Sequence, residues 1–181
     1  ALAFVIPQPP VAAADVTGTD DEFPVRRIYC VGRNYAEHAR EMGHDPDREP
    51  PFIFQKSPDN LVRLPPGGEG NFPYPPVSDT VHHEIELVAA LSGGGTDIPE
   101  ADALDLVWGY AVGLDMTRRD LQGQAKKMGQ PWDAGKAFEH SAPMGPITPA
   151  ADTGHIAEGR IWLDVNGETR QDGNVNQLIW S

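Results

Sequence analysis

His82-His83-Glu84-Ile85-Glu86-Leu87 is the stretch that decides how this chain folds and what it can bind. Successive side chains of a β-strand point to opposite faces, so Glu84 and Glu86 share one face and the two apolar residues share the other. The apolar residues 88–91 follow directly, which predicts that this strand enters a hydrophobic core. Two carboxylates at the edge of a core repel each other unless a cation lies between them.

A third acid follows the next apolar run. Residues 107–114 predict a second buried strand, and Asp115 comes directly after it, about 30 residues beyond the first two acids. Carboxylate oxygens favour Mg²⁺, Mn²⁺ or Ca²⁺ over zinc, so Glu84, Glu86 and Asp115 are candidate ligands of a hard divalent cation. The alternative interpretation is a solvated edge strand that carries both glutamates on its outer face.

Composition favours a single domain built from many short strands. The chain has 181 residues, and its 19 glycines and 18 prolines favour turns over a helical bundle. A formal net charge of −13 argues against nucleic-acid binding, and no apolar run approaches the length of a membrane span. Cys30 is the only cysteine, which excludes an intrachain disulfide and predicts a reducing, cytoplasmic location.

Turn residues divide the chain into predicted elements. Asn166-Gly167 is the strongest hairpin signal in the chain, and Gly129 is expected to end a helix. The predicted strands cover residues 27–31, 52–56, 84–91, 107–114, 161–165 and 168–171, and the predicted helices cover residues 35–42 and 118–128.

Two regions are expected from the distribution of proline and apolar residues. Residues 1–24 predict an N-terminal arm that packs loosely on the body or on a partner subunit, and residues 25–181 form the main domain. Residues 178–181 resemble the apolar lead-in and N-cap of a helix without the helix, so we expect the domain to lack its C-terminal part.

Four motifs match, in order, those of a known family. They are Tyr29-Cys30-Val31-Gly32-Arg33-Asn34-Tyr35-Ala36-Glu37-His38, the opening hexapeptide, residues 113–122, and Lys136-Ala137-Phe138 with Pro143-Met144-Gly145-Pro146. Over residues 26–181 the chain resembles the fumarylacetoacetate hydrolase family. Within it, residues 40–46 are most similar to the fumarylpyruvate hydrolases of bacterial gentisate degradation, a branch of aromatic catabolism.

This resemblance implies a fold, a cofactor and a partner. The implied fold is α+β and mostly β, a mixed β-sandwich roll of the family's C-terminal-domain type. The implied cofactor is Mg²⁺ or Mn²⁺, held by Glu84, Glu86 and Asp115. A homodimer is also implied, with a small diketo acid as the substrate.

The resemblance also assigns catalytic residues. His38 and Glu41 match the family's water-activating pair, and their spacing places both on one face of a helix, where the carboxylate can orient the imidazole. Lys136 matches the active-site lysine. Without the resemblance, these residues would be interpreted as a solvated surface pair and a surface lysine.

Three further residues are candidates for substrate binding. Gln122 matches a polar residue near the metal, and Arg33 and Lys56 could hold a carboxylate. A lysine beside a metal ion is unfavourable unless an anion lies between them, which predicts a negatively charged substrate.

Three functions therefore stay open. The first is metal-dependent hydrolysis of a carbon–carbon bond in a 2,4-diketo acid, with fumarylpyruvate giving fumarate and pyruvate. The second is decarboxylation of oxaloacetate or a related acid, or hydrolysis of another acylpyruvate. The third is a non-catalytic metal-binding dimerisation domain.

Overall fold

The computed structural model of this chain describes residues 3–35 and 50–181. Its main sheet has five strands, and β8 (Val107–Leu114) is the central one, because β7, β10 and β11 all pair with it. β10 also pairs in parallel with β5, while the pairs that involve β8 are antiparallel. The other four strands are β5 (Leu61–Arg63), β7 (Ile85–Leu91), β10 (Ala142–Met144) and β11 (Thr148–Pro149).

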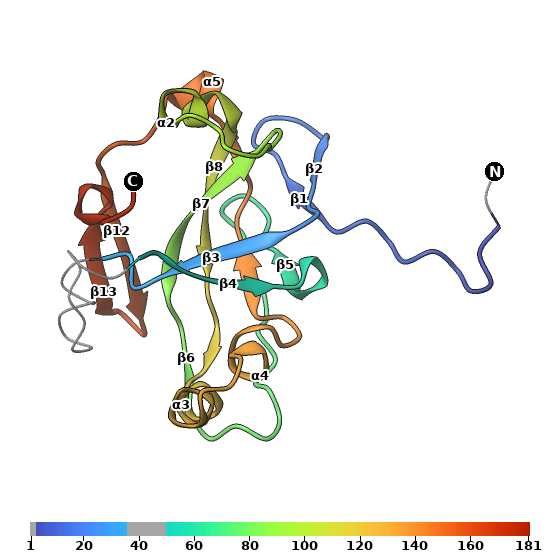
Figure 1. Cartoon of the computed structure of the whole chain (residues 1–181), viewed down its shortest axis with the longest axis vertical. Coiled ribbons are helices and arrows are strands. Elements are labelled where there is room, and N and C mark those ends of the chain that lie inside the picture. Colours follow the sequence, from blue (N-terminus) through green and yellow to red (C-terminus); the bar gives the residue numbers. More distant parts are fainter. Residues whose placement is uncertain (1–2, 36–49) are drawn as a thin grey trace.

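Two-stranded ribbons surround this sheet (Figure 1). In the view of Figure 1 the ribbon of β3 and β4 runs across β7 and β8, and the C-terminal ribbon lies to one side of them. The ribbons are β1 (Ala13–Asp15) with β2 (Glu22–Pro24), β3 (Ile28–Gly32) with β4 (Phe52–Lys56), β6 (Val81–His82) with β9 (Thr117–Arg118), and β12 (Arg160–Val165) with β13 (Glu168–Asn174).

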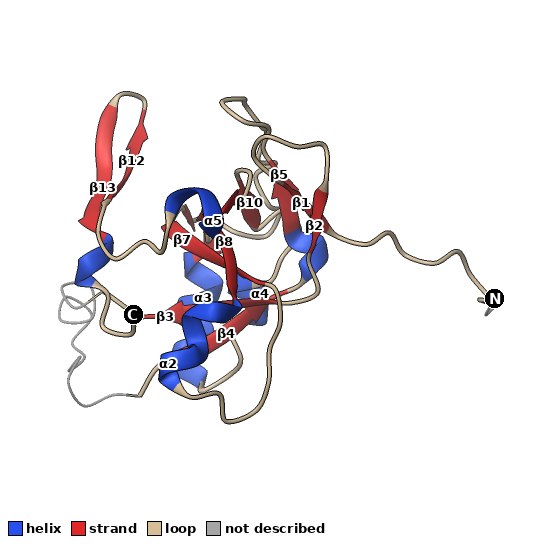
Figure 2. Ribbon diagram, turned by 90° about the horizontal axis from the view of Figure 1, so that it is seen from above, coloured by secondary structure: helices blue, strands red, loops and turns tan. Residues whose placement is uncertain are grey.

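The helices are short, and two of them matter for the site. α3 (Arg119–Met128) ends at Gly129, whose φ of 63° is left-handed and therefore suits glycine. α4 (Asp133–Lys136) follows directly and lies near α3 at one end of the sheet (Figures 1 and 2). The remaining helical turns are Pro58–Asn60, α2 (Glu100–Ala103), Leu104–Leu106, α5 (Ala150–Thr153) and Val175–Gln177. None of the described helices has the length and apolar character needed to cross a membrane.

Small residues allow close packing in the core. Gly109 of β8 has no room for a side chain, since a Cβ there would lie 2.5 Å from the carbonyl oxygen of Thr148 in β11. The buried core cluster lies where β1, β7, β8 and β10 meet, and it consists of Ala14, Ala90, Ala111, Met144 and Ile147.

The fold is α+β and mostly β, as predicted. The Asn166-Gly167 hairpin is confirmed: both residues have positive φ, 53° and 83°, and they join β12 to β13. The first helix predicted, residues 35–42, lies largely outside the described residues.

Segments near both ends of the chain contact its body. Residues 13–24 form the β1–β2 hairpin, and Ala14 belongs to the core. Near the C-terminus, the backbone N–H of Ile179 donates to the carbonyl of Asn34 over 2.7 Å, and Leu178 forms a bridge with Tyr35.

Candidate metal and active site

The pairing of β7 with β8 brings two acidic positions together. Ile85 pairs with Leu114, and the backbone N–H of Asp115 donates to the carbonyl oxygen of Glu84 over 2.8 Å. Glu84 therefore precedes β7 and Asp115 follows β8 at the same end of the antiparallel pair. The predicted convergence of two strands at one edge is confirmed for these two acids.

Lys136, the last residue of α4, bridges the two acids. Its Nζ donates to Glu84 Oε2 over 2.8 Å, to Asp115 Oδ2 over 2.7 Å and to Thr117 Oγ1 over 2.7 Å. The lysine side chain is only 3% exposed, and the ring centroid of Phe54 lies 4.9 Å from Nζ. A buried ammonium requires partners of this kind, because an unpaired buried charge costs several kcal/mol.

Arg119, the first residue of α3, holds the other oxygen of Glu84. Its Nη2 donates to Glu84 Oε1, its Nη1 donates to Gln122 Oε1 over 2.6 Å, and its Nε donates to His82 Nδ1 over 3.3 Å. Burial alone would raise the pKa of Glu84, but the charges and hydrogen bonds of Lys136 and Arg119 hold it below its usual value. Glu84 is therefore ionised at neutral pH.

Lys56, the last residue of β4, contacts the other oxygen of Asp115. Its Nζ lies 2.8 Å from Asp115 Oδ1 as an ion pair, and it donates to the carbonyl of Met116 over 3.1 Å and to that of Lys136. The side chain is 2% exposed. Burial lowers the pKa of this lysine, and the nearby charge of Asp115 raises it part of the way back.

Glu86 completes the acidic cluster. Burial raises the pKa of Glu86 to about 8, and the charges of Asp115 and Glu84 add to that rise. Glu86 therefore interacts electrostatically with both of the other acids.

These residues fit a hard divalent cation. Two of the acids already share one cationic group, the ammonium of Lys136, and all three offer oxygen donors. Within residues 3–35 and 50–181, no three His, Cys, Asp or Glu side chains form a preformed metal cage. Instead, Glu84 and Asp115 each turn one oxygen toward the ammonium of Lys136.

An aromatic cluster supports this site. The ring of Trp132 packs on Phe52 and Phe54, with centroid distances of 4.6 and 5.9 Å, and the guanidinium of Arg33 lies over Phe52 at 5.3 Å. A cavity of about 490 Å³ adjoins the three rings, and Lys136 is among the residues that line it. None of the three acids lines this cavity, so Lys136 is the residue that it shares with the acidic cluster.

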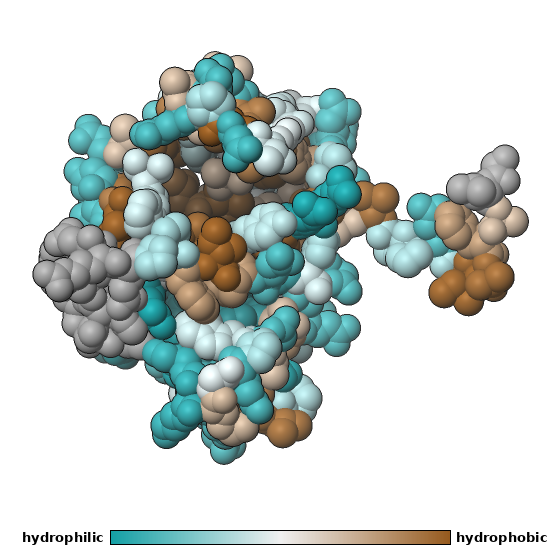
Figure 3. Space-filling model, in the orientation of Figure 1, coloured by the Kyte–Doolittle hydropathy of each residue, from teal (hydrophilic) through white to brown (hydrophobic). Residues whose placement is uncertain are grey.

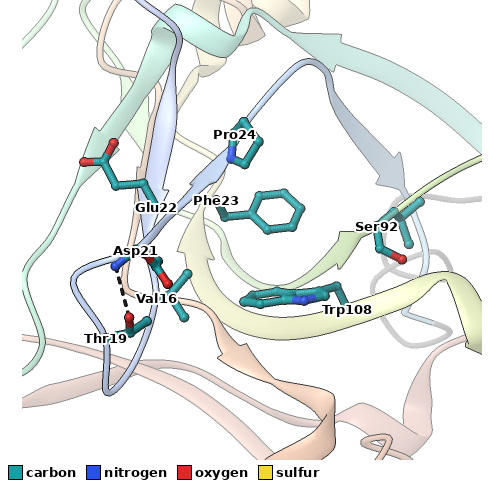
Figure 4. Close-up of a pocket in the computed structure, with 9 residues that line it drawn as sticks. Val16, Thr19, Asp21, Glu22, Phe23, Pro24, Ser92 and Trp108 are labelled. Atoms are coloured by element: carbon teal, nitrogen blue, oxygen red, sulfur yellow. Dashed lines mark hydrogen bonds between the residues drawn. The ribbon is translucent and has the colours of Figure 1, made fainter.

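Two other hollows have different surroundings. A pocket of about 450 Å³ lies between the β1–β2 hairpin and Trp108, with Phe23 5.3 Å from that ring (Figure 4). None of the predicted site residues lines it. The face in Figure 3 also shows a hydrophobic hollow above the β3–β4 ribbon, and an extended N-terminal segment on which Phe4 is 61% exposed.

The predicted site residues fall into three groups. Glu84, Asp115 and Lys136 lie in one cluster, Gln122 joins it through Arg119, and the charges of the cluster act on the pKa of Glu86. Lys56 contacts Asp115 from β4, and Arg33 lies over the aromatic rings. The predicted catalytic pair, His38 and Glu41, lies outside the described residues.

Two residues of the cluster were not predicted from the sequence. Thr117 is completely buried and accepts a hydrogen bond from Lys136, and Arg119 binds Glu84. Both lie within a few residues of Asp115, in the motif of residues 113–122. A polar side chain two residues after a metal-ligand candidate was the available signal for Thr117.

The comparison with known proteins identifies the family. Residues 27–181 match the family described as fumarylacetoacetate hydrolase C-terminal. The chain belongs to the fumarylacetoacetate hydrolase family. This confirms the resemblance, and it makes the protein an enzyme of hydrolase or lyase type.

Members of the family with solved structures or known names differ in the reaction they perform. The crystal structure of fumarylpyruvate hydrolase from Pseudomonas aeruginosa, in complex with Mn²⁺ and pyruvate, is 52% identical, with a TM-score of 0.96 over 99% of this chain and 77% of that one. The mitochondrial oxaloacetate tautomerase of Arabidopsis thaliana is 41% identical over 85% of this chain and 67% of its own. The mitochondrial oxaloacetate decarboxylase of Dictyostelium discoideum is 36% identical over 86% of this chain and 69% of its own.

These names leave the finer assignments as proposals. The family members act on different small acids, so the substrate and the reaction are argued below. The homodimer and the cytoplasmic location stay predictions.

Proposed function

We propose that this protein uses a divalent metal ion to hydrolyse the carbon–carbon bond of an acylpyruvate, with fumarylpyruvate giving fumarate and pyruvate. The observation that carries the proposal is the similarity to the Pseudomonas aeruginosa fumarylpyruvate hydrolase, which extends over 99% of this chain at 52% identity. That enzyme was crystallised with Mn²⁺ and pyruvate, the metal and one product of the proposed reaction. In this chain, Glu84, Glu86 and Asp115 would hold the ion.

The charge of the cluster supports a substrate with two negative charges. Once a bound ion has displaced the proton of Glu86, the site has three carboxylates, Glu84, Glu86 and Asp115, and three cations, Lys56, Lys136 and Arg119. A divalent ion would leave an excess of two positive charges, and a dianion restores the balance. Fumarylpyruvate and oxaloacetate each carry two carboxylates, whereas acetylpyruvate carries one.

The proposed reaction consumes one water molecule. Water adds to the keto carbon of the acyl group, and the bond from that carbon to the pyruvyl methylene breaks. The electron pair stays on the pyruvyl carbon as an enolate, which takes up a proton to give pyruvate, while the hydrated carbon becomes a carboxylate of fumarate. When bound, Mg²⁺ or Mn²⁺ supplies a Lewis acid that stabilises developing negative charge.

The side chains have separate roles in this proposal. His38, oriented by Glu41, accepts the proton of the attacking water, a role that rests on the sequence motif. Lys136 donates to the oxygen that becomes negative when water adds. Its position between Glu84 and Asp115 supports this role, because it places a cation beside the proposed metal ligands.

Oxaloacetate is the second candidate substrate, favoured by the names of the relatives that are 36–41% identical. Loss of carbon dioxide from oxaloacetate also leaves a pyruvate enolate, but it requires no attacking water. A tautomerase reaction requires only that a proton move between carbon and oxygen. The same acidic cluster and Lys136 would serve either reaction, whereas His38 would be needed for hydrolysis.

A three-substrate assay tests the proposal. Ultraviolet absorbance follows fumarylpyruvate, acetylpyruvate and oxaloacetate with the full-length protein and Mn²⁺. We expect fumarylpyruvate to disappear fastest, with a kcat/KM at least about 10-fold above that of acetylpyruvate because the second carboxylate is bound. EDTA should stop turnover, and added Mn²⁺ should restore it.

Two results would overturn this assignment. Faster consumption of oxaloacetate than of fumarylpyruvate would make decarboxylation or tautomerisation the main activity, and His38→Ala should then spare it. If none of the three acids is consumed, the protein is better described as a non-catalytic metal-binding domain.

A further inference from the structure

Lys56 has the sequence context of a substrate-binding lysine, but its surroundings point to another role. Three oxygen atoms surround its ammonium: Asp115 Oδ1 and the backbone carbonyls of Met116 and Lys136. The two carbonyls accept hydrogen bonds from the ammonium, and Asp115 Oδ1 lies 2.8 Å away as an ion pair without a hydrogen bond. Protein oxygens surround the ammonium, and the 2% exposure of the side chain leaves a substrate carboxylate no open approach to it.

The kind of partner separates Lys56 from Lys136. All three partners of Lys136 are side-chain oxygens, and two of them belong to the proposed metal ligands. Two partners of Lys56 are backbone carbonyls, which neither an ion nor a substrate would replace. The side chain of Lys56 is 2% exposed, and the Phe138 ring lies 5.7 Å from its Nζ.

These contacts join three separate parts of the site to one strand. Asp115 follows β8, Met116 leads into β9, and Lys136 ends α4. Lys56 holds all three from the end of β4.

The other inward-facing residues of β4, Phe52 and Phe54, lie close to residues at the two ends of α4. Phe54 lies two residues before Lys56, on the same face of the strand, and its ring supports the ammonium of Lys136 at 4.9 Å. Phe52, on that face as well, packs on Trp132 at the start of α4 at 4.6 Å.

We propose that Lys56 is a positioning residue that holds Asp115 and α4 in register with each other, so that Lys136 meets both Glu84 and Asp115, and that it does not bind substrate. The inference rests on the proposed function for the role of Lys136 and Asp115. Lys56 fixes the geometry, and Lys136 and the acids do the chemistry.

The test compares Lys56→Met with the wild-type full-length protein. Methionine keeps the length and burial of the side chain but removes the ammonium, so Asp115 and two carbonyls lose their partner. We measure kcat at saturating Mn²⁺ with the acid that the wild-type protein consumes fastest in the three-substrate assay. We expect kcat to fall about 100-fold, as for residues that orient metal ligands. The dissociation constant of pyruvate, measured by calorimetry with the Mn²⁺-loaded protein, should stay within about 3-fold, because no substrate contact is lost.

Two outcomes would overturn the proposal. A pyruvate dissociation constant or a KM that rises 10-fold or more while kcat is retained would make Lys56 a substrate-binding residue. A kcat within about 3-fold of wild type would leave it without a role in the site. Lys127→Met is the matched control: Lys127 is exposed on α3, and kcat should not change.

A second variant covers the case in which Lys56→Met fails to fold. Phe54→Leu keeps an apolar side chain but removes the ring beneath Lys136, so kcat should fall about 5-fold, with pyruvate binding retained. An unchanged kcat in Phe54→Leu would count against positioning by β4. If the wild-type protein consumes none of the three acids, the proposed function is wrong. If it consumes any of them, the two variants test the role of Lys56.

Discussion

At the scale of single residues, the site is a balance between acids and cations that come from different elements. Glu84 and Asp115 each have both carboxylate oxygens within contact distance of a cation. The cations are Lys56 from β4, Arg119 from α3 and Lys136 from α4. A buried pair of this kind contributes little when intact but is costly to break, since the remaining charge stays buried.

Lys136→Met tests this balance in the absence of metal. With EDTA present, the variant should lower the free energy of unfolding by about 3 kcal/mol, because Glu84 and Asp115 lose their shared partner. Mn²⁺ should recover part of the loss, since a divalent cation can take the place of the ammonium. Urea denaturation of both proteins measures the difference.

The control for this prediction is Lys127→Met, on the exposed surface of α3. It should change stability by less than about 0.5 kcal/mol. A Lys136→Met protein as stable as wild type in EDTA would show that the acids do not depend on the ammonium.

Glu86 gives the site a dependence on pH. Its pKa is raised from 4.5 to about 8 in the folded protein, so the folded state holds one more proton than the unfolded state between these values. The stability that this proton contributes is fully present below pH 4.5 and is lost as pH rises toward 8. A metal ligand must be ionised, so Mn²⁺ binding displaces the proton.

We therefore expect Mn²⁺ affinity to rise by up to about 10-fold per pH unit below pH 8 and to level off above it. Calorimetric titrations of the metal-free protein between pH 6 and 9 measure this slope. Glu86→Gln should bind Mn²⁺ more weakly and lose the dependence. A wild-type affinity that is flat across this interval would contradict a raised pKa at Glu86.

At the scale of elements, the position of α4 decides where Lys136 lies. Gly135 faces α3 so closely that a Cβ there would lie 2.9 Å from the backbone nitrogen of Gln122. The Cα and Cβ of Gln122 would lie 3.0 Å from the same Cβ, and none of these three atoms can rotate away. Glycine at this position therefore allows α4 to approach α3 and brings Lys136 to the acids.

Gly135→Ala should push α4 away from α3 and lower kcat about 10-fold or more, since displacements of about 1 Å can have effects of this size. Steady-state kinetics with the best of the three acids measures the loss. Gly123→Ala is the matched control in α3, where a Cβ would meet nothing within 4 Å. That change should leave kcat intact and stabilise the helix by up to about 1 kcal/mol.

Equal activity of Gly135→Ala and Gly123→Ala would show that the approach of the two helices is unimportant for the site. A loss in both would indicate a general effect on α3 instead.

At the scale of the whole molecule, the site lies where a central sheet, a crossing ribbon and two helices meet (Figures 1 and 2). The burial of Glu86 near the charges of Asp115 and Glu84 is part of the cost of forming this junction. An ion that binds only the folded state should therefore stabilise the whole molecule.

Mn²⁺ at about 100 times its dissociation constant should raise the free energy of unfolding by about 2.7 kcal/mol, and EDTA should reverse the gain. Thermal or urea unfolding followed by circular dichroism measures it. Asp115→Asn should bind the ion more weakly and show a smaller gain at the same Mn²⁺ concentration. A melting temperature that does not respond to Mn²⁺ would contradict a metal site in the folded protein.

The sequence by itself determined the elements and the acids. Alternation in residues 84–91 predicted a buried strand with two glutamates at its start, and Asn166-Gly167 predicted the hairpin between β12 and β13. Convergence of the acids followed from two apolar strands pairing side by side, which places Asp115 beside Glu84. These signals are local, because strand periodicity and turn geometry depend on neighbouring residues.

Only the tertiary structure decided which cations meet those acids. Lys56 reaches carbonyls 60 and 80 residues further along the chain, and Arg119 reaches Glu84 35 residues back. Contacts over such separations depend on how β4, α3 and α4 pack, and no spacing in the sequence encodes that packing. The sequence motif suggested a substrate contact for Lys56, whereas burial and three nearby oxygens place it inside the protein, because an ammonium removed from water must find its partners there.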